Sequence, residues 1–311
     1  MDVVSDAISA VRVGRPSSNR LRVSGRWCVR LAPYEGAGFH VVLGGACRLL
    51  PEEGGDPVDL GTGDVVLLPH GAGHVLAHGA AEPAEVRRAV PFEEVRDEDV
   101  RFPEDGPEVE LLCGKYRLDR SRAHPLMAEL PETVHLRNRV GAHPELRAAV
   151  DLLARELTGT HPGSALALPG LLDLLLIYVL RAWMTEAPTG VWPTALTDPA
   201  TATALRALHT DPAAPWSNDL LAARAGVSRA TLSRRFTTLV GRPPMAYLTW
   251  WRLTLAATRL RDSDVPLATV ARETGYGSPY ALSHAFSREF GTTPGRYREK
   301  ARAGLPVLRA S

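Results

Sequence analysis

The chain has few cysteines, few lysines and no long uninterrupted apolar run. Three cysteines in 311 residues cannot form the disulfide framework of a small secreted protein, and they fit a reducing compartment. The most apolar stretch, residues 171–183, is too short to span a bilayer and contains Asp173 and Arg181. No basic region followed by an apolar segment and a cleavage site opens the chain, so we expect no secretory signal. These features favour a cytoplasmic globular protein with no membrane partner.

The sequence also lacks an overall charge, but its charges are unevenly distributed. The formal net charge is +1. Residues 201–311 contain 16 Lys and Arg against 7 Asp and Glu, whereas residues 1–200 contain 20 against 28. The C-terminal part therefore carries +9 and the rest of the chain carries −8. Such a division between the halves of a chain indicates that the basic half binds nucleic acid.

Hydrophobic patterning divides the chain into a β-rich part and a helical part. Short β-branched or alternating runs separated by turn residues occupy Trp27–Leu31, Phe39–Leu43, Val65–Leu68 and Glu108–Leu112. Several short strands with frequent turns predict a barrel or jelly roll. From about residue 143 the apolar residues recur every three or four positions, which predicts helices. Residues 187–200 include a stretch rich in Pro and Thr and are expected to form a linker.

The C-terminal part contains an internal repeat with an offset of 50 residues. The repeated residues are Ser228 and Ser278, Leu232 and Leu282, Ser233 and Ser283, Phe236 and Phe286, Gly241 and Gly291, Pro244 and Pro294, and Tyr247 and Tyr297. In each unit a glycine, Gly226 or Gly275, ends one helix, and a serine three or fewer residues later begins the next. This spacing predicts two helix-turn-helix units. A long amphipathic helix over Pro244–Leu260 would hold them apart, so that both recognition helices can enter adjacent major grooves, about 34 Å apart.

Specific motifs accompany the repeat. They are Leu220-Leu221-Ala222-Ala223, Gly226-Val227-Ser228, Leu232-Ser233-Arg234-Arg235-Phe236, Gly241-Arg242-Pro243-Pro244, Val270-Ala271, Gly275-Tyr276, and Phe286 to Pro294 with Tyr297-Arg298. On these motifs residues 204–300 resemble the DNA-binding domain of the AraC/XylS family of bacterial transcription regulators. The resemblance implies promoter DNA and RNA polymerase as partners, and transcriptional activation as the commoner mode.

The exposed faces of the second helix in each unit supply the candidate DNA contacts. The expected base-reading residues are Arg229, Ala230, Ser233 and Arg234 in the first unit and Pro279, Tyr280, Ser283 and His284 in the second. Arg234 is the strongest candidate because arginine can pair with guanine O6 and N7 through two hydrogen bonds. The arginines expected to contact phosphates are Arg235, Arg252, Arg288, Arg296 and Arg298. For each of them the alternative is a solvated surface side chain.

The N-terminal part carries a second motif. Residues 63–74 fit the pattern G-x5-P-x-G-x2-H, the second motif of the cupin barrel, and end at His74. The whole half resembles the cupin-type sensor domain found in one branch of AraC/XylS regulators. The first cupin motif normally supplies two histidines and a glutamate, but only His40 is present and position 42 is valine. The metal-binding set of a catalytic cupin is therefore incomplete.

A divalent metal, Zn in particular, remains one expectation for the barrel. His40, His74 and Cys113 directed into one barrel would suit it, and His70 could replace one ligand. The alternative is an empty or small-molecule pocket with hydrogen-bonded histidines. A redox effector acting on Cys113, with Cys28 or Cys47 as the resolving thiol, is a further alternative.

Taken together, the sequence predicts an α+β multidomain regulator. We expect a cupin-like jelly-roll sensor over residues 1–140, a helical connector that can form a homodimer over 141–186, a linker over 187–200, and an all-α double helix-turn-helix domain over 201–301. The expected function is sequence-specific, effector-responsive regulation of transcription, without catalysis. The alternatives are a metal-dependent cupin enzyme with an appended DNA-binding domain, and a nonspecific DNA-binding protein. The identity of the effector and the target promoter are not encoded in any pattern we find.

Overall fold

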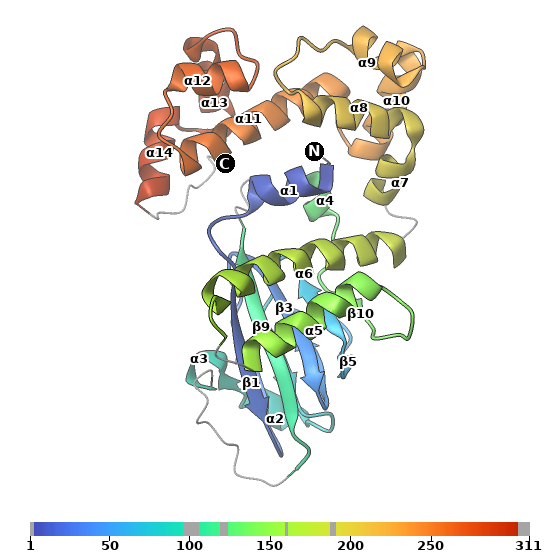
Figure 1. The fold of residues 1–311 in the computed structure, drawn as a ribbon, viewed down its shortest axis with the longest axis vertical. Coiled ribbons are helices and arrows are strands. Elements are labelled where there is room, and N and C mark those ends of the chain that lie inside the picture. The colour runs from blue at the N-terminus through green and yellow to red at the C-terminus, as the bar shows by residue number, and fades with distance from the viewer. Residues whose placement is uncertain (1–2, 96–105, 119–123, 159–160, 187–190, 304–311) are drawn as a thin grey trace. The chain divides into compact units, whose positions relative to one another are not determined.

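The computed structural model describes residues 3–95, 106–118, 124–158, 161–186 and 191–303. The chain divides into two compact units (Figure 1). The barrel unit contains residues 12–119 and 130–187, and the C-terminal unit contains residues 1–11, 120–129 and 188–311. The predicted combination of an N-terminal β-sheet domain and a C-terminal helical domain is confirmed.

Two five-stranded sheets form the barrel unit. Its strands are β1 (Ser17–Val23), β2 (Cys28–Leu31), β3 (Gly36–Gly44), β4 (Ala46–Pro51), β5 (Val58–Gly61), β6 (Val65–Leu68), β7 (His74–Ala77), β8 (Val90–Pro91), β9 (Val109–Arg117) and β10 (Val134–Leu136). One sheet has the order β1-β9-β3-β6-β10 and the other β5-β4-β7-β2-β8. All pairings are antiparallel except that of β2 with β8. Sequence patterning located β2, β3, β6 and β9 but not the other strands.

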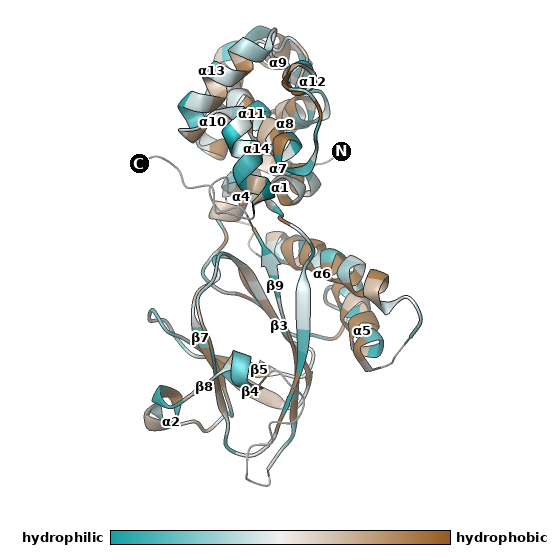
Figure 2. Ribbon diagram, turned by 90° about the vertical axis from the view of Figure 1, so that its left-hand side faces the viewer, coloured by the Kyte–Doolittle hydropathy of each residue, from teal (hydrophilic) through white to brown (hydrophobic). Residues whose placement is uncertain are grey.

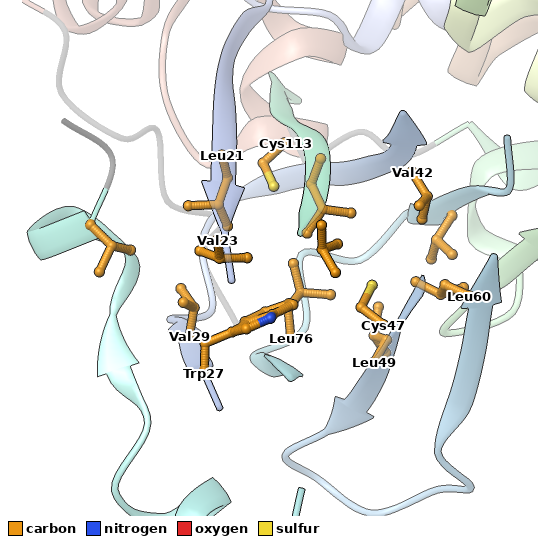
Figure 3. Close-up of a cluster of buried hydrophobic side chains, with 14 of the residues drawn as sticks. Leu21, Val23, Trp27, Val29, Val42, Cys47, Leu49, Leu60, Leu76 and Cys113 are labelled. Carbon is orange, nitrogen blue, oxygen red and sulfur yellow. The ribbon is translucent and has the colours of Figure 1, made fainter. Parts of the chain in front are cut away.

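Alternate residues of both sheets form a common core. Figure 3 shows aliphatic side chains from β1, β2, β3, β4, β5 and β7 around Trp27, with Cys47 and Cys113 among them. Val29, Leu49 and Leu76 are almost completely excluded from solvent. Since successive residues of a strand point to opposite faces, one face of each sheet is committed to this core.

Helices cover the outer face of the sheet that contains β3 and β9. The helices of this unit are α2 (Pro83–Arg87), α3 (Phe92–Val95), α5 (Pro144–Thr158) and α6 (Ser164–Glu186). Figure 2 shows α5 and α6 alongside that sheet, and the Tyr116 hydroxyl of β9 donates a hydrogen bond to the Leu172 carbonyl of α6 at 2.5 Å. By length and composition α6 is the one helix in the described ranges apolar enough to cross a membrane. Here Leu172, Leu176 and Val179 are buried against the rest of the unit.

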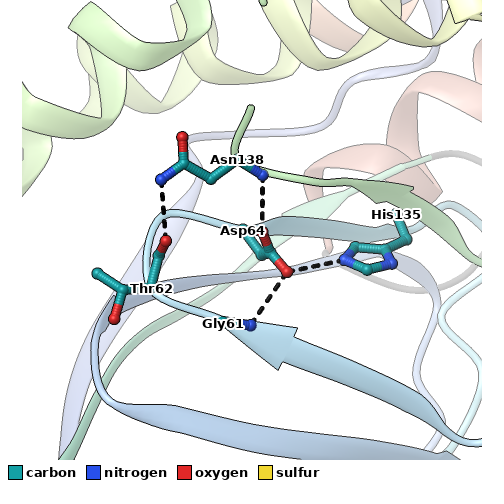
Figure 4. A network of polar contacts seen from close by, with 5 residues as sticks. All are labelled: Gly61, Thr62, Asp64, His135 and Asn138. Atoms are coloured by element: carbon teal, nitrogen blue, oxygen red, sulfur yellow. Dashed lines mark hydrogen bonds and ion pairs between the residues drawn. The ribbon is translucent and has the colours of Figure 1, made fainter. Parts of the chain in front are cut away.

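Asp64 fixes the turn that begins the cupin motif. Its carboxylate accepts hydrogen bonds from the backbone N–H groups of Gly61 (3.0 Å) and Asn138 (2.7 Å) and from Nε2 of His135 (3.0 Å), as Figure 4 shows. The Asn138 side chain in turn donates to the Thr62 carbonyl at 3.0 Å. Partial burial alone would raise the pKa of Asp64, but these three hydrogen bonds hold that pKa below its ordinary value. The end of β10 is thereby held against the turn between β5 and β6.

The C-terminal unit is entirely helical in its described residues. Its helices are α1 (Val3–Val11), α4 (Pro125–Ala128), α7 (Val191–Thr197), α8 (Pro199–Thr210), α9 (Asn218–Ala225), α10 (Arg229–Val240), α11 (Pro244–Asp262), α12 (Leu267–Glu273), α13 (Pro279–Phe290) and α14 (Pro294–Arg302). The pair α9–α10 and the pair α12–α13 are the two helix-turn-helix units, and α11 runs between them (Figure 1).

The predicted helix ends are confirmed. Ser228 and Ser278 are N-caps whose side chains accept hydrogen bonds from the backbone N–H groups of Thr231 and Ala281. Gly226 ends α9 with a φ of 67°, a left-handed conformation that costs glycine little because it lacks a Cβ atom. The repeat therefore encodes the same serine N-cap twice, whereas the turn before it differs, because the C-cap of α12 is Thr274 and Gly275 follows with a φ of 76°.

The structure differs from the predicted domain boundaries in two places. Residues 191–197 of the expected linker form α7, with Trp192 and Ala195 buried, while residues 187–190 lie outside the described residues. Prolines in the first turn of a helix do not interrupt it, so the Pro-rich composition was misleading. Residues 1–11 and 120–129, expected in the sensor, belong to the C-terminal unit. Apolar side chains explain this placement, because Val3, Ala7 and Leu126 are buried there.

Candidate nucleic-acid interface

Helix α10 presents a polar face to solvent. Leu232 and Phe236 are buried, whereas Arg229, Ala230 and Arg234 are exposed and Ser233 is partly exposed. The Arg229 guanidinium lies 3.7 Å from the Asp219 carboxylate of α9, a loose surface pair. The helix thus leaves the predicted base-reading side chains available, and their assignment to bases stays a prediction.

Helix α13 presents the corresponding face of the second unit. Leu282, Phe286 and Phe290 are buried, and Tyr280 is 81% exposed, which is unusual for a large aromatic side chain. A shallow depression runs along this face, lined by Tyr280, Ser283, His284, Ser287 and Arg288. Pro279 opens the helix directly after its N-cap. Ser287 was not among the predicted contacts, although its spacing of seven residues from Tyr280 places it on the same face.

The arginines expected to contact phosphates fall into two groups. Arg288 and Arg296 are exposed, and Arg235 is half exposed with its guanidinium 3.5 Å from the Asp198 carboxylate. Arg252 instead donates to the carbonyls of Pro212 and Ala214, and Arg298 donates to the carbonyl of Val265 at 2.6 Å. The prediction that Arg252 and Arg298 contact phosphates stays a prediction, although part of each guanidinium is already bonded inside the unit.

A hydrogen-bonded network of buried polar groups lies in the interior of the C-terminal unit. The Tyr247 hydroxyl is 2.9 Å from Nε2 of His124 and 2.8 Å from Nε2 of His209. Nδ1 of His209 lies 2.9 Å from the Asp6 carboxylate. All four side chains are buried, and they come from α1, α8, α11 and the N-cap of α4. Sequence patterning missed this network because directly bonded members are as many as 203 residues apart in the sequence.

The hydrogen bonds at the two ends of this network determine where each of its protons lies. The Leu126 backbone N–H donates to Nδ1 of His124, so the neutral His124 ring carries its proton on Nε2 and donates to Tyr247. The Asp6 carboxylate accepts from Nδ1 of His209, which leaves Nε2 of His209 to accept the Tyr247 hydroxyl proton. Burial, with a smaller effect from His209, holds the pKa of His124 well below its ordinary value. The buried rings of Trp192, Trp250 and Trp251 pack around the histidines of this network and exclude water from it.

The barrel brings two of its predicted ligands together. The Nε2 atoms of His40 and His74 are 2.7 Å apart, and both residues are buried. Nδ1 of His74 lies 3.0 Å from the Ala72 carbonyl and therefore carries the proton, so Nε2 of His74 accepts from His40. Nδ1 of His40 is then left buried without a hydrogen-bond partner among the described residues. Burial is the main reason that the pKa values of both histidines lie below the ordinary value.

The third predicted ligand, Cys113, does not complete a metal site. Within the ranges that the structure describes, no three His, Cys, Asp or Glu side chains are placed to hold a metal ion. Cys113 pairs in register with His40, but its thiol belongs to the apolar core. His70 is held elsewhere, 2.7 Å from the Leu130 carbonyl. Two imidazoles are fewer than the three protein ligands that a zinc site needs, so the residues do not fit a zinc ion.

The cysteines are also poorly suited to redox chemistry. Cys28, Cys47 and Cys113 are all buried free thiols. Burial raises the pKa of Cys47 to about 12 and that of Cys28 to about 11, and the pKa of Cys113 is raised further. The thiolate is the reactive form of cysteine, so thiols with pKa values raised in this way react poorly and do not suit a redox sensor.

Comparisons with known proteins cover both units. Residues 2–185 match the family described as Cupin, and residues 221–300 match the family described as Helix-turn-helix domain. An AraC-like transcription regulator of Streptomyces lividans is 36% identical over 301 residues, with 96% of this chain and 98% of the relative aligned. The regulator MtrA of Neisseria gonorrhoeae is 29% identical over 312 residues, with 96% and 99% aligned. A crystal structure of the DNA-binding domain of AdpA, a global transcriptional factor, in complex with a target DNA is 36% identical, and it covers 36% of this chain and 100% of that chain with a TM-score of 0.33.

Proposed function

The chain belongs to the AraC family of DNA-binding transcription regulators, and from this membership we propose that it binds promoter DNA with α10 and α13 in adjacent major grooves. The observation that carries the proposal is the pair of matched units on α11, each with a capped second helix whose outer face is exposed. Arg234 and Tyr280 then read bases, while Arg235, Arg288 and Arg296 contact phosphates. Regulation takes place in the cytoplasm, where RNA polymerase meets the promoter.

Selection from random double-stranded DNA, followed by sequencing, tests this proposal. We expect a bipartite site whose two half-sites are about 10 base pairs apart, one turn of B-DNA. The recovered sites can be matched to promoters, where addition of RNA polymerase to a transcription assay separates activation from repression. Equal enrichment of all sequences would identify a nonspecific DNA-binding protein instead.

We further propose that a small molecule binds in the barrel beside His40 and changes DNA binding. Support comes from Nδ1 of His40, a buried acceptor that a ligand with an N–H or O–H group would satisfy. Strand β9, which pairs with His40, continues along the chain to residues 120–129 of the C-terminal unit. There His124 bonds to Tyr247 of α11. An effector acts through this route only if it binds the two states with different affinity.

We propose no catalytic activity for the barrel. Val42 stands where a catalytic cupin has its second histidine, and the described side chains do not supply a third metal ligand. The proposal agrees with relatives that are named transcription regulators. Incubation with candidate small molecules should therefore return them unchanged while DNA affinity shifts.

We propose a homodimer formed through α5 and α6. Leu166 is 75% exposed, and Leu152 and Leu174 are also exposed, so this helical pair presents three large apolar side chains to solvent. Dimer formation would double the DNA footprint and steepen its salt dependence. Sedimentation of the native chain and of Leu166→Glu tests this, since only the native chain should form the dimer.

A further inference from the structure

Arg252 lies in α11, and its guanidinium holds the loop that leads into the first helix-turn-helix unit. Nε donates a hydrogen bond to the Pro212 carbonyl at 2.7 Å, and Nη2 donates to the Ala214 carbonyl at 2.8 Å. Hydrogen bonds from a charged donor are about twice as strong as neutral ones, and the planar fork fixes the direction of both. The residue is partly buried, so these contacts are only partly open to competition from water.

The loop held by Arg252 is fixed by its own hydrogen bonds and contacts α9 through Trp216. The Asp211 side chain accepts a hydrogen bond from the Ala214 N–H at 3.1 Å, and the Trp216 indole donates to the Asp211 carbonyl at 2.7 Å. The Trp216 ring in turn faces the Arg224 guanidinium of α9 at 5.7 Å. Movement of this loop would therefore move the first unit with it.

The turn of the second helix-turn-helix unit packs against the same guanidinium. Gly275 has a φ of 76°, and a Cβ atom there would lie 2.8 Å from Nη2 of Arg252 and 2.8 Å from Cα of Ala213. Glycine is therefore required by both the backbone conformation and the available space. The two units thus meet at Arg252, in addition to their connection through α11.

We propose that Arg252 is a positioning residue that fixes the two helix-turn-helix units relative to each other and so sets the half-site spacing that the protein accepts. The proposal rests on the proposed binding of both α10 and α13 to DNA. Adjacent major grooves on one face of DNA repeat about every 34 Å. Both recognition helices can contribute to the affinity at the same time only when their separation matches this repeat. Without the guanidinium, each unit would keep its own reading face but the pair would lose its common orientation.

The test uses the full chain and a site recovered by the selection described above. Binding is measured on the intact site, on a site with one half scrambled, and on a site with one base pair inserted between the halves. For Arg252→Met we expect the affinity for the intact site to fall by up to about tenfold, because two charged hydrogen bonds are lost. The affinity for the half-scrambled site should stay near the native value. The inserted base pair should weaken the variant less than it weakens the native protein. Gly275→Ala, which crowds both the guanidinium and the Ala213 backbone at the contact between the units, should give the same pattern.

Arg259→Met is the matched control, because Arg259 lies on the same helix and pairs with Glu273 at 3.1 Å. It should keep the native spacing dependence. Equal losses for Arg252→Met on intact and half-scrambled sites, with a salt dependence of log K shallower by about 0.9, would identify a phosphate contact and overturn the proposal. If Arg252→Met does not fold, the same measurements are made on Gly275→Ala and Arg252→Lys. A native dependence on half-site spacing in both variants would overturn the proposal. If scrambling either half leaves native binding unchanged, the proposed two-helix binding itself fails.

Discussion

The Tyr247 hydroxyl donates its proton to Nε2 of His209 across 2.8 Å, in an interior from which both side chains are almost completely hidden from solvent. The direction of this bond follows from the groups at either end of the polar network, since the Leu126 N–H fixes His124 and the Asp6 carboxylate fixes His209. A buried network in which each role is fixed specifies one packing of its helices. Tyr247 therefore joins α11 to segments from the start and the middle of the chain.

Tyr247→Phe should destabilise the protein by about 2–4 kcal/mol, because two buried imidazole nitrogens would lose their partner. The free energy of unfolding can be measured by denaturant titration. Tyr280→Phe is the matched control, since Tyr280 is 81% exposed and its loss of a hydroxyl should change stability by less than about 0.5 kcal/mol. Equal stability of Tyr247→Phe and the native chain would contradict the assigned network.

Stability should fall on mild acidification through His124. An unfolded imidazole titrates near pH 6.5, whereas burial and the nearby His209 hold the pKa of folded His124 well below this value. Below about pH 6.5 the unfolded chain gains a proton that the folded chain resists, so the free energy of unfolding decreases by up to about 1.4 kcal/mol per pH unit. The titratable groups that face His124 are His209 of α8 and Tyr247 of α11, with Asp6 of α1 beyond them.

His124→Asn isolates this contribution. Asparagine keeps the N-cap of α4 but has no group that titrates in this range. Between about pH 7 and 5.5 the variant should lose less stability than the native chain, although it is less stable at pH 7. Parallel pH profiles for the two proteins would show that His124 does not carry the effect.

Arg234→Ala should weaken binding to the selected site by about 1–3 kcal/mol, with a much smaller loss on random DNA, because a bidentate guanine contact discriminates between bases. Arg234 is exposed on α10, on the face opposite the buried Leu232 and Phe236. Competition binding with both DNAs measures the ratio. Equal losses on both would assign Arg234 to the phosphate backbone.

Arg288→Ala and Arg296→Ala should behave in the opposite way. Both arginines are exposed, and a phosphate contact gives affinity without sequence preference. We expect similar losses on selected and random DNA, and a slope of log K against log salt that is shallower by about 0.9 for each. An unchanged slope would remove either residue from the set of phosphate contacts.

Purified protein should contain less than about 0.1 equivalents of zinc, because His40 and His74 supply only two ligands where three or four are needed. Elemental analysis of protein prepared without chelator measures this. Near one equivalent of metal, lost in His74→Ala, would show that a third ligand joins the pair.

Local chemistry was predictable from the sequence, and long-range packing was not. Helix ends are predicted by the side-chain hydrogen bonding of Ser228 and Ser278 and by the backbone preference of Gly226. The structure confirms each of these ends. The inner faces marked by Leu232 and Phe286 are likewise buried as expected. Such features depend on neighbours within a few residues, so a pattern in the sequence is enough to find them.

The failures share a different cause. Nothing near Asp6 in the sequence indicates that it meets His209, and nothing near Arg252 indicates that two carbonyls occupy its guanidinium. An arginine on an amphipathic helix is equally compatible with solvent, phosphate and an internal carbonyl. Strand register likewise places Cys113 opposite His40, but it does not fix where their polar atoms lie, and the described residues include no three side chains placed to hold a metal ion.

The assignment of residues 1–11 and 120–129 to the C-terminal unit limits how this protein can be recombined. A fragment that starts at residue 188 would carry Tyr247 and His209 but neither Asp6 nor His124, and it would expose the apolar surface that Val3 and Leu126 cover. Exchange of a sensor between relatives at a single junction would leave the same surface bare. A chimera that transfers these three separated pieces of sequence together would keep this surface covered.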